Sequence, residues 1–455
     1  MICKRCCGSD MSCVSLFLYN RFSQKKEVFS PINPEKITMY VCGPTVYGPI
    51  HIGNGRSIVV FDALFRVLRY LFPEVVYVRN ITDVDDKINA EAQKLGIPIN
   101  ELTKNTIAQF HQDINKLHVL PVSVEPKATC HISHMIEIIK KLLDKGVAYL
   151  SNGHVLFDVL KDPFYGSLSG AHKEEILAGA RVEVAPYKRN PQDFVLWKPA
   201  IEDHEFWPSP WGNGRPGWHT ECSAMSLEYL GTTFDIHGGG ADLLFPHHEN
   251  ENAQTRNALG VEHPVKHWVH NGMLMVEGQK MSKSLGNVLL LKDVLAQFPG
   301  SVVRWALLSS HYRHTLDWNS SLLHQATQCM EHVNRVLELP WDGKHCLDAD
   351  FLAYLCDDLN TPGALNALHL LAKRALQDQK WVSSVHTCAN FLGIQKISSS
   401  LTLEISKEIE DLIKERTQAR EEKNFQRADE LRQKLEDFGI IIQDTPQGTL
   451  WHKKI

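Results

Sequence analysis

Residues 36–55 read KITMYVCGPTVYGPIHIGNG, and their pattern is the strongest indication of the fold in this chain. Its apolar side chains alternate at Ile37, Met39 and Val41, which predicts a β-strand over residues 36–41. The glycines and prolines that follow predict a loop. Apolar residues then recur at helical spacing from residue 58 to residue 68, and residues 75–79 resemble a second strand. A strand, a loop, a helix and a strand in this order form a βαβ unit with parallel strands.

Parallel sheets bind ligands beyond the carboxyl ends of their strands, where residues 42–54 and 80–86 are expected. Residues 233–236 and 266–270 also predict strands; the first ends in a glycine run, GGGAD, and leads to a helix from about residue 246. We therefore predict an α/β fold with a Rossmann-type parallel sheet in two halves. An insertion of helices and loops, about residues 98–218, separates the halves.

The C-terminal third is predicted to be helical. Residues 401–438 are amphipathic with a break near residue 423, which indicates an antiparallel helix pair, and residues 440–451 predict a hairpin. The expected organisation is a terminal extension (1–13), a Rossmann-type domain (14–318), an α-helical bundle (319–400) and a small tail (401–455).

Composition excludes several classes of protein. With 455 residues, 22% charged and 43% hydrophobic, the chain is neither disordered throughout nor fibrous, and about 150 residues per domain predicts several domains. A net charge of −5 argues against non-specific coating of nucleic acid. No apolar run approaches the roughly 18 residues of a membrane span. Eleven cysteines without a secretion signal predict a reducing cytoplasm and mostly free thiols.

Four cysteines crowd the first thirteen residues: Cys3, Cys6, Cys7 and Cys13. A zinc knuckle would need a second pair of cysteine or histidine ligands at the spacing of a zinc finger, and the sequence after these cysteines contains no such pair. We interpret this segment as a loose extension, with Met11 as an alternative start.

Two motifs are candidates for binding phosphate. HIGN, residues 51–54, falls between a strand end and a helix N-terminus, where His51 and Asn54 supply donors and Gly53 allows close approach. KMSKS, residues 280–284, offers Lys280 and Lys283 in a glycine-flanked loop, as a cationic clamp for a polyphosphate. Each motif alone also fits an ordinary turn or surface loop; their order across a split parallel sheet makes the pair specific.

A third candidate is a metal site. Cys42 follows a predicted strand, Cys222 lies in GWHTECSAMS, and His247 and Glu251 are four residues apart on a predicted helix. Zinc accepts such a mixture of sulfur, nitrogen and oxygen donors. Spacing alone leaves the alternatives open, since cysteines often simply pack in cores and the histidines at 219, 237 and 248 compete for the role.

The sequence resembles the cysteinyl-tRNA synthetase family of class I aminoacyl-tRNA synthetases, from about residue 19 to residue 451. The resemblance rests on YVCGPTVYGPIHIGN, NITDVDDKI, GWHTECSAMS, GGGADLLFPHHENENAQ, KMSKSLGN and GTLW. It implies one zinc ion per chain on Cys42, Cys222, His247 and Glu251, which resolves the choice between His247 and His248. It also implies substrate-binding roles for Thr82, Trp218 and Asp242, and ATP contact from Lys283. Asn54 departs from the general class I signature, which ends in histidine.

The implied reaction joins L-cysteine to its tRNA through a cysteinyl-adenylate, with ATP and Mg²⁺. Zinc would select the cysteine thiolate against serine. A pocket that distinguishes substrates by shape alone gains only about 1–3 kcal/mol of discrimination from such a small difference. Residues 401–455 would bind the anticodon, and a cytoplasmic monomer is expected. Two alternatives remain: a ligase that joins cysteine to an amino sugar without tRNA, and a non-catalytic relative that binds RNA or stores zinc.

The tail allows two interpretations. Its basic residues (Arg416, Arg420, Lys423 and Arg427) alternate with glutamates, which fits either a solvated helix face or an RNA surface. Trp451 could stack on an anticodon base or pack the hairpin onto the helices.

Overall fold

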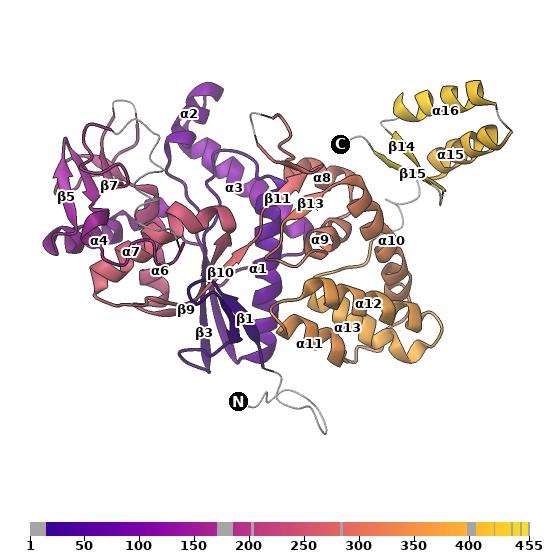
Figure 1. Cartoon of the computed structure of the whole chain (residues 1–455), viewed down its shortest axis with the longest axis horizontal. Helices are drawn as coiled ribbons and strands as arrows, with labels where there is room; N and C mark the ends of the chain where they lie inside the picture. Colours follow the sequence, from indigo (N-terminus) through magenta and orange to yellow (C-terminus); the bar gives the residue numbers. More distant parts are fainter. Residues whose placement is uncertain are drawn as a thin grey trace.

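The computed structural model describes residues 15–170, 185–201, 204–282, 285–397, 406–422, 424–437, 440–445 and 448–453. The central sheet of the fold has four parallel strands, in the order β10-β9-β3-β4 (Figure 1). The strands are β3 (Lys36–Val41), β4 (Glu74–Arg79), β9 (Phe234–Gly240) and β10 (Val265–Asn271). The predicted α/β sheet in two halves is confirmed. The terminal extension (1–13) lies outside the described residues.

Helix α1 (Ile52–Leu71) connects β3 to β4 and packs on the sheet through buried apolar side chains such as Phe61 and Leu64. The strand predicted over residues 233–236 is β9, which continues through the glycine run to Gly240. A Cβ atom at Gly238 would meet the Phe61 ring at 2.2 Å, so only glycine lets α1 lie this close to the strand. These residues keep strand pairing with β10 because glycine still offers its backbone N–H and C=O groups.

The insertion between the two halves contains more strand than the sequence predicts. It holds a four-stranded antiparallel sheet, whose strands are β5 (Ala148–Ser151), β6 (His154–Phe157), β7 (Phe194–Pro199) and β8 (Gly214–Pro216). Its strands are too short for alternation to stand out, although the apolar run FVLW in β7 is a recognisable signal. The helices of this region are α2 (Asp86–Leu95), α3 (Ile99–Lys116), α4 (Ile132–Asp144) and α6 (Trp218–Leu230).

A smaller three-stranded sheet contains Lys280, the first residue of the KMSKS motif. Its order is β12-β11-β13, formed by β11 (Leu274–Val276), β12 (Gln279–Lys280) and β13 (Leu316–Trp318). The helices α8 (Leu291–Gln297) and α9 (Gly300–Leu308) lie between β12 and β13 in the sequence. The helix expected from residue 246 is α7 (Glu249–Leu259), and a separate hairpin pairs β1 (Phe17–Asn20) with β2 (Lys25–Val28).

The C-terminal third is helical, as predicted (Figure 1). Its longer helices are α10 (Ser320–Leu337), α11 (Ala349–Cys356), α12 (Thr361–Ala375), α13 (Val382–Phe391), α15 (Ser406–Glu421) and α16 (Phe425–Asp437). The expected helix pair is α15 with α16, and the expected hairpin joins β14 (Ile440–Thr445) to β15 (Gly448–Lys453). The single-turn elements are η1 (Ala128–His131), η2 (Val159–Lys161), η3 (Ala241–Leu243), η4 (Leu244–His248) and η5 (Gln379–Trp381). None of the described helices is both long and apolar enough to span a bilayer.

Candidate active site

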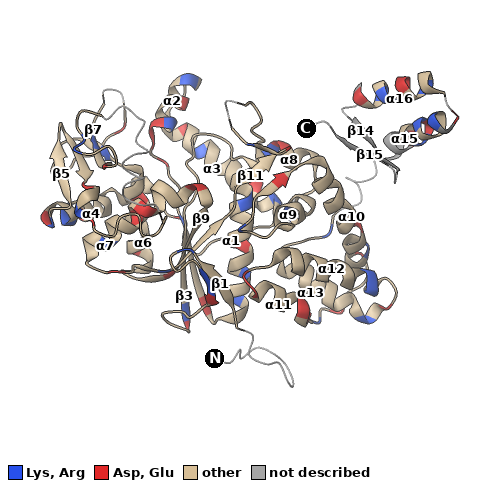
Figure 2. Ribbon diagram, viewed as in Figure 1, with Lys and Arg blue, Asp and Glu red and all other residues tan. Residues whose placement is uncertain are grey.

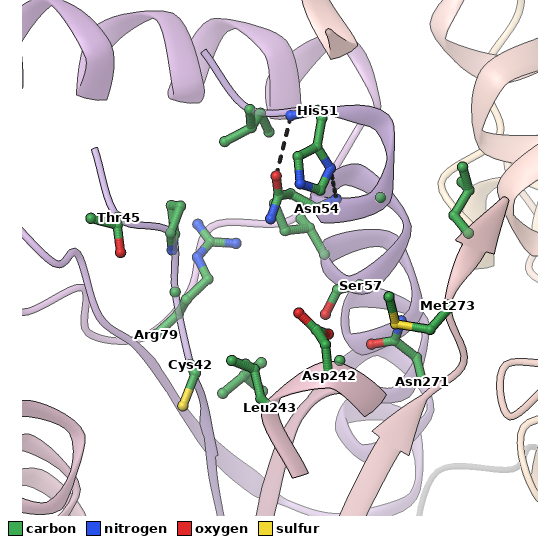
Figure 3. Close-up of a pocket in the computed structure, with 18 of the residues that line it drawn as sticks. Cys42, Thr45, His51, Asn54, Ser57, Arg79, Asp242, Leu243, Asn271 and Met273 are labelled. Carbon is green, nitrogen blue, oxygen red and sulfur yellow. Dashed lines mark hydrogen bonds between the residues drawn. The ribbon is translucent and has the colours of Figure 1, made fainter. Parts of the chain in front are cut away.

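A pocket of about 390 Å³ opens where the central strands end, as expected for a parallel sheet (Figure 3). Cys42 borders it after β3, Asp242 borders it after β9, and Asn271 closes β10 beside it. His51 and Asn54 face it from the start of α1. Chain segments far apart in the sequence therefore meet at one edge of the sheet.

His51 and Asn54 hold each other in a capping box at the start of α1. The backbone N–H of Asn54 donates to His51 Nδ1 at 3.2 Å, and the backbone N–H of His51 donates to Asn54 Oδ1 at 3.2 Å. Because Nδ1 accepts, the neutral ring carries its proton on Nε2 and can donate from there. Asn54 thus orients the histidine while its own amide nitrogen remains a donor.

The helix end itself offers fewer N–H groups to an anion than the sequence suggests. The N–H of Ile52 donates to the Leu289 oxygen at 2.9 Å, and that of Asn54 is used by the capping box. Gly53 has a packing reason: a Cβ there would come within 3.0 Å of the His51 ring and 3.2 Å of the Met281 methyl group. The glycine thus lets Met281 of the KMSKS motif lie directly on the first turn of α1.

Lys280 lies on β12 with an exposed side chain, and Met281 after it lines the pocket. Asn287 closes the loop at both ends: its side chain donates to the Lys280 oxygen at 3.2 Å and accepts from the Ser282 N–H at 2.9 Å. Lys283 lies outside the described residues. Sequence analysis missed Asn287, which belongs to the KMSKSLGN run and could have been suspected from its turn-forming side chain.

Cys42, Cys222, His247 and Glu251 meet in a buried group that we call the thiol cluster. Their ligand atoms all lie within 4.8 Å of one another. The Sγ atom of Cys42 is 3.6 Å from that of Cys222 and 3.4 Å from Glu251 Oε1. Tetrahedral zinc keeps its ligand atoms roughly 3.3–3.8 Å apart, given bonds of about 2.0–2.3 Å. The residues therefore fit a zinc ion in both donor chemistry and spacing.

A second donor set overlaps the thiol cluster. It shares Cys42 and Glu251 but replaces the other two ligands with His237 and His248. His237 Nε2 lies 2.9 Å from Glu251 Oε2, and His248 Nδ1 lies 2.8 Å from His270 Nε2. The set with two sulfurs suits zinc better, and the others are well placed to orient its ligands. The geometry thus explains why spacing alone left several histidines in competition.

Charge is unevenly distributed within the thiol cluster. A hydrogen bond from Cys42 lowers the pKa of Cys222 to about 6, whereas burial raises the pKa of Cys42 well above its ordinary value. Burial alone would raise the pKa of Glu251, but attraction to His237 and His247 outweighs it and holds that pKa well below its usual range. The protein therefore concentrates anionic ligand atoms at a buried point, where a divalent cation can replace the shared protons.

The three residues with implied substrate roles occupy different positions. Trp218 is partly exposed, borders the pocket and lies over the His247 ring, with the centroids 4.3 Å apart. Asp242 also borders the pocket. Thr82 is buried behind these residues: its hydroxyl donates to Glu221 Oε2 at 2.8 Å and accepts from the Asn80 amide at 3.1 Å.

Sequence analysis did not single out Asn80, which joins the two strand-end loops, or Glu221 on α6. The Asn80 side chain accepts from the Gly43 N–H at 2.8 Å, next to Cys42. Glu221 precedes Cys222 and holds Thr82. Burial raises the pKa of Glu221 well above its ordinary value. The signal available was position alone, because Asn80 is the first residue after β4 and Glu221 adjoins a candidate ligand.

Comparisons with known proteins agree with these motifs. Residues 28–328 match the family model of the class I (C) tRNA synthetase catalytic domain, and residues 402–451 match that of the cysteinyl-tRNA ligase anticodon binding domain. A cysteine–tRNA ligase of Beijerinckia indica is 50% identical, over 97% of this chain and 100% of the relative. A cysteine–tRNA ligase of Granulibacter bethesdensis is 48% identical, over 98% and 97%.

Solved structures share the fold at low identity. Methionyl-tRNA synthetase of Mycobacterium tuberculosis in complex with methionyl-adenylate gives a TM-score of 0.56 at 15% identity, over 79% of this chain and 89% of that one. The LeuRS–tRNA–LeuAMS complex of Agrobacterium radiobacter gives 0.55 at 12% identity, over 80% and 83%. Similarity at this level supports the architecture alone.

Proposed function

Since the chain belongs to the cysteinyl-tRNA synthetase family of class I aminoacyl-tRNA synthetases, we propose that its thiol cluster holds a zinc ion for recognition of the substrate cysteine. The enzyme is a cysteine–tRNA ligase, which charges tRNA with cysteine at the expense of ATP. The observation that most directly supports the zinc proposal is the position of Cys42. It belongs to the thiol cluster and also borders the pocket that contains His51 and Asn54.

The amino-sugar ligase considered as an alternative finds no support. The matched anticodon-binding region, residues 402–451, is what a tRNA enzyme requires and an amino-sugar ligase does not. The curated relatives with near-complete coverage are cysteine–tRNA ligases. A non-catalytic relative is also disfavoured, because both HIGN and KMSKS are present in the sequence.

The reaction needs a means of rejecting serine, which differs from cysteine by one atom. Bound in the thiol cluster, zinc would offer a coordination site that a substrate thiolate fills well and an alcohol fills poorly. Trp218 lies between His247 and the pocket, and its exposed face is available to cover the substrate side chain. Asp242 supplies a carboxylate at the same pocket for the substrate ammonium group. Thr82 would not contact the substrate directly; it would help to hold the loop at Gly43 in place through its hydrogen bond with Asn80.

ATP binds on the opposite side of the pocket in this proposal. His51 and Asn54 donate to the phosphate that reacts, with the backbone at Gly53 beside them. Lys280 and Lys283 balance the charge of the leaving pyrophosphate, and Mg²⁺ bound with ATP would supply further positive charge to the phosphates. The carboxylate of cysteine attacks the α-phosphorus, and the bond to the bridging oxygen of pyrophosphate breaks. A hydroxyl of the tRNA 3′-terminal ribose then attacks the adenylate carbonyl and releases AMP. Catalysis of this kind depends mainly on positioning and charge.

The C-terminal regions are assigned to tRNA. We place the bundle at residues 319–400 and the anticodon-binding region at 401–455; the family model matched over residues 402–451 supports the second assignment. Figure 2 shows blue and red residues interleaved on α15 and α16. Arg427 pairs with Glu415 at 3.5 Å and Glu430 at 3.2 Å, and Arg416 is buried, so these two arginines favour a structural role. Lys423 and the side chain of Trp451 lie outside the described residues. We further propose a monomer that works in the cytoplasm, where reduced thiols such as Cys42 persist.

The decisive experiment compares cysteine with serine in ATP–pyrophosphate exchange, using zinc-loaded and zinc-free protein. The zinc-loaded protein should exchange pyrophosphate with cysteine alone, and removal of the metal should abolish that exchange. Undiminished cysteine-dependent exchange in protein shown by elemental analysis to lack zinc would refute the role of the thiol cluster. Charging of tRNA in the same preparation tests the second step.

A further inference from the structure

Arg56 is a fully buried cation on the second turn of α1, two residues after the HIGN motif. Its Nη1 donates to the backbone oxygens of Gly272 and Met273, at 2.9 and 2.7 Å. Its Nη2 donates to those of His311 and His314, at 3.3 and 2.7 Å. Burial lowers the pKa of Arg56 to about 10, so the side chain keeps its charge at neutral pH. One guanidinium thus bridges two separate loops through four carbonyl oxygens.

The two loops touch each other at the same place. The Gly272 N–H donates to the Tyr312 oxygen at 2.7 Å, and a Cβ at Gly272 would lie 2.4 Å from the His314 oxygen. Several carbonyl dipoles consequently point toward one small volume, an arrangement that is unfavourable without a cation or donors to satisfy it. Arginine suits the position because its planar fork reaches both loops at once, which a lysine ammonium does not.

Each loop leads directly into the sheet that carries Lys280. Residues 272–273 run into β11, and residues 311–314 run into β13. These strands pair with each other, Leu274 beside Leu316, and β11 pairs with β12 so that Met275 stands beside Lys280. The hydrogen bonds of Arg56 therefore hold the start of this three-stranded sheet against α1, the helix that His51 caps.

The far end of the KMSKS loop is tied to the same helix start. Ile52 donates to the Leu289 oxygen at 2.9 Å, and the Leu291 N–H donates to the Ile50 oxygen at 2.9 Å. The chain before Lys280 is thus held to α1 through Arg56, and the chain at Leu289 is held to the start of α1 through backbone hydrogen bonds. Both anchors belong to the chain around HIGN.

We propose that Arg56 is a positioning residue that fixes the distance between the two phosphate-binding motifs, HIGN and KMSKS. The proposal rests on the proposed role of Lys280 in binding ATP. Arg56 touches neither substrate; it acts through the backbone at Gly272 and Met273, which lead to β11 and Lys280. Its loss shifts the lysine relative to His51 and weakens the ATP side of the site. The cysteine side, built by Cys222, His247 and Trp218 on other elements, keeps its geometry.

The test is Arg56→Lys in the full-length zinc enzyme, with Arg304→Lys as a matched control. Arg304 is equally buried and also donates to backbone oxygens, those of Leu117 and Leu392, but it lies on α9 and binds Asp62. Both variants should lose thermal stability. R56K alone should lower kcat/KM for ATP in pyrophosphate exchange by at least about tenfold, since small displacements of a catalytic group are costly. The KM for cysteine should stay within about twofold of wild type.

Gly272→Ala provides a second variant if R56K does not fold. Its new methyl group points at the His314 loop, so it separates the two loops while Arg56 remains. The same selective loss on the ATP side supports the proposal. Wild-type ATP kinetics in folded R56K or G272A, or equal changes for ATP and cysteine, overturn it.

Lys280→Ala separates this inference from the function it rests on. If K280A leaves ATP kinetics unchanged, the proposed role of Lys280 fails. If K280A impairs ATP use and R56K does not, only the positioning role of Arg56 fails.

Discussion

Cys42 and Cys222 are 180 positions apart in the sequence, yet their Sγ atoms lie 3.6 Å apart. The first follows β3 in the first half of the sheet, and the second lies on α6, which precedes the second half. Their meeting depends on the whole crossover, so the thiol cluster can form only when both halves are folded. The proposed function of this thiol pair therefore depends on the complete fold.

Replacing Cys222 with serine should abolish zinc binding and cysteine activation together, because a hydroxyl is a poor ligand for zinc and leaves only three ligands. Metal content by elemental analysis and cysteine-dependent pyrophosphate exchange measure the two effects. Cys388→Ser is the matched control: Cys388 is equally buried but lies on α13, in the helical bundle. It should lose some stability while keeping its zinc. Separation of the two effects in C222S, with metal lost and activation intact, contradicts the prediction.

Replacing Asn54 with aspartate should raise the KM for ATP by about tenfold or more, while thermal stability changes little. The new carboxylate can still accept the His51 N–H, so the capping box persists. Its negative charge also suits a helix N-terminus. The same charge repels a phosphate, and one such repulsion is worth roughly 1.4 kcal/mol or more in a partly enclosed site. Asn54→Gln, which stays neutral, should lie closer to wild type; equal ATP kinetics in N54D and wild type count against a phosphate role for Asn54.

Local patterns were enough to predict the central sheet. The alternation over residues 36–41 and the apolar run at 75–79 correspond to β3 and β4 within a residue, because a buried parallel strand needs a short apolar stretch bounded by loop residues. The strands of the insertion escaped prediction because they are three to six residues long and their order depends on pairing with distant partners. The sequence also does not explain the glycine at position 238, which allows close contact between β9 and Phe61.

The motifs of the candidate site could be predicted from the sequence, but the contacts between its side chains could not. HIGN, KMSKS and the cysteines stand out in the sequence, and the family resemblance selected His247 among competing histidines. Neither source reveals that Glu221 holds Thr82 or that Arg56 bridges two loops, since those contacts depend on three-dimensional packing between residues 139 and more than 200 positions apart. Buried polar networks carry little local sequence signal because any polar residue is compatible with a loop.

Removing residues 401–455 should leave cysteine-dependent pyrophosphate exchange intact and reduce tRNA charging. The thiol cluster, the pocket and the KMSKS segment all precede residue 300. Loss of the anticodon contacts should lower kcat/KM for tRNA by roughly a hundredfold, equivalent to about 3 kcal/mol of binding. A shortened protein that charges tRNA as well as the full chain contradicts the assignment of this region. Loss of exchange as well would show that the tail supports the catalytic domain.

Replacing Asp62 with asparagine should lower the free energy of unfolding by about 3–5 kcal/mol near pH 7, because two arginines lose their buried partner. Asp62 accepts from Arg66 at 2.7 Å and from Arg304. Burial alone would raise the pKa of Asp62, but these two charges outweigh it and lower the pKa. The ion pair therefore stabilises fully above the unfolded pKa of about 4, and its contribution fades as the pH falls through the folded value. Urea unfolding should show that the difference in free energy of unfolding between wild type and D62N becomes smaller in acid.

Asp357→Asn is the control, because it breaks an exposed pair with Lys26 and should cost at most about 1 kcal/mol. An equal loss of stability in both variants contradicts the argument, and so does a difference between wild type and D62N that becomes larger in acid.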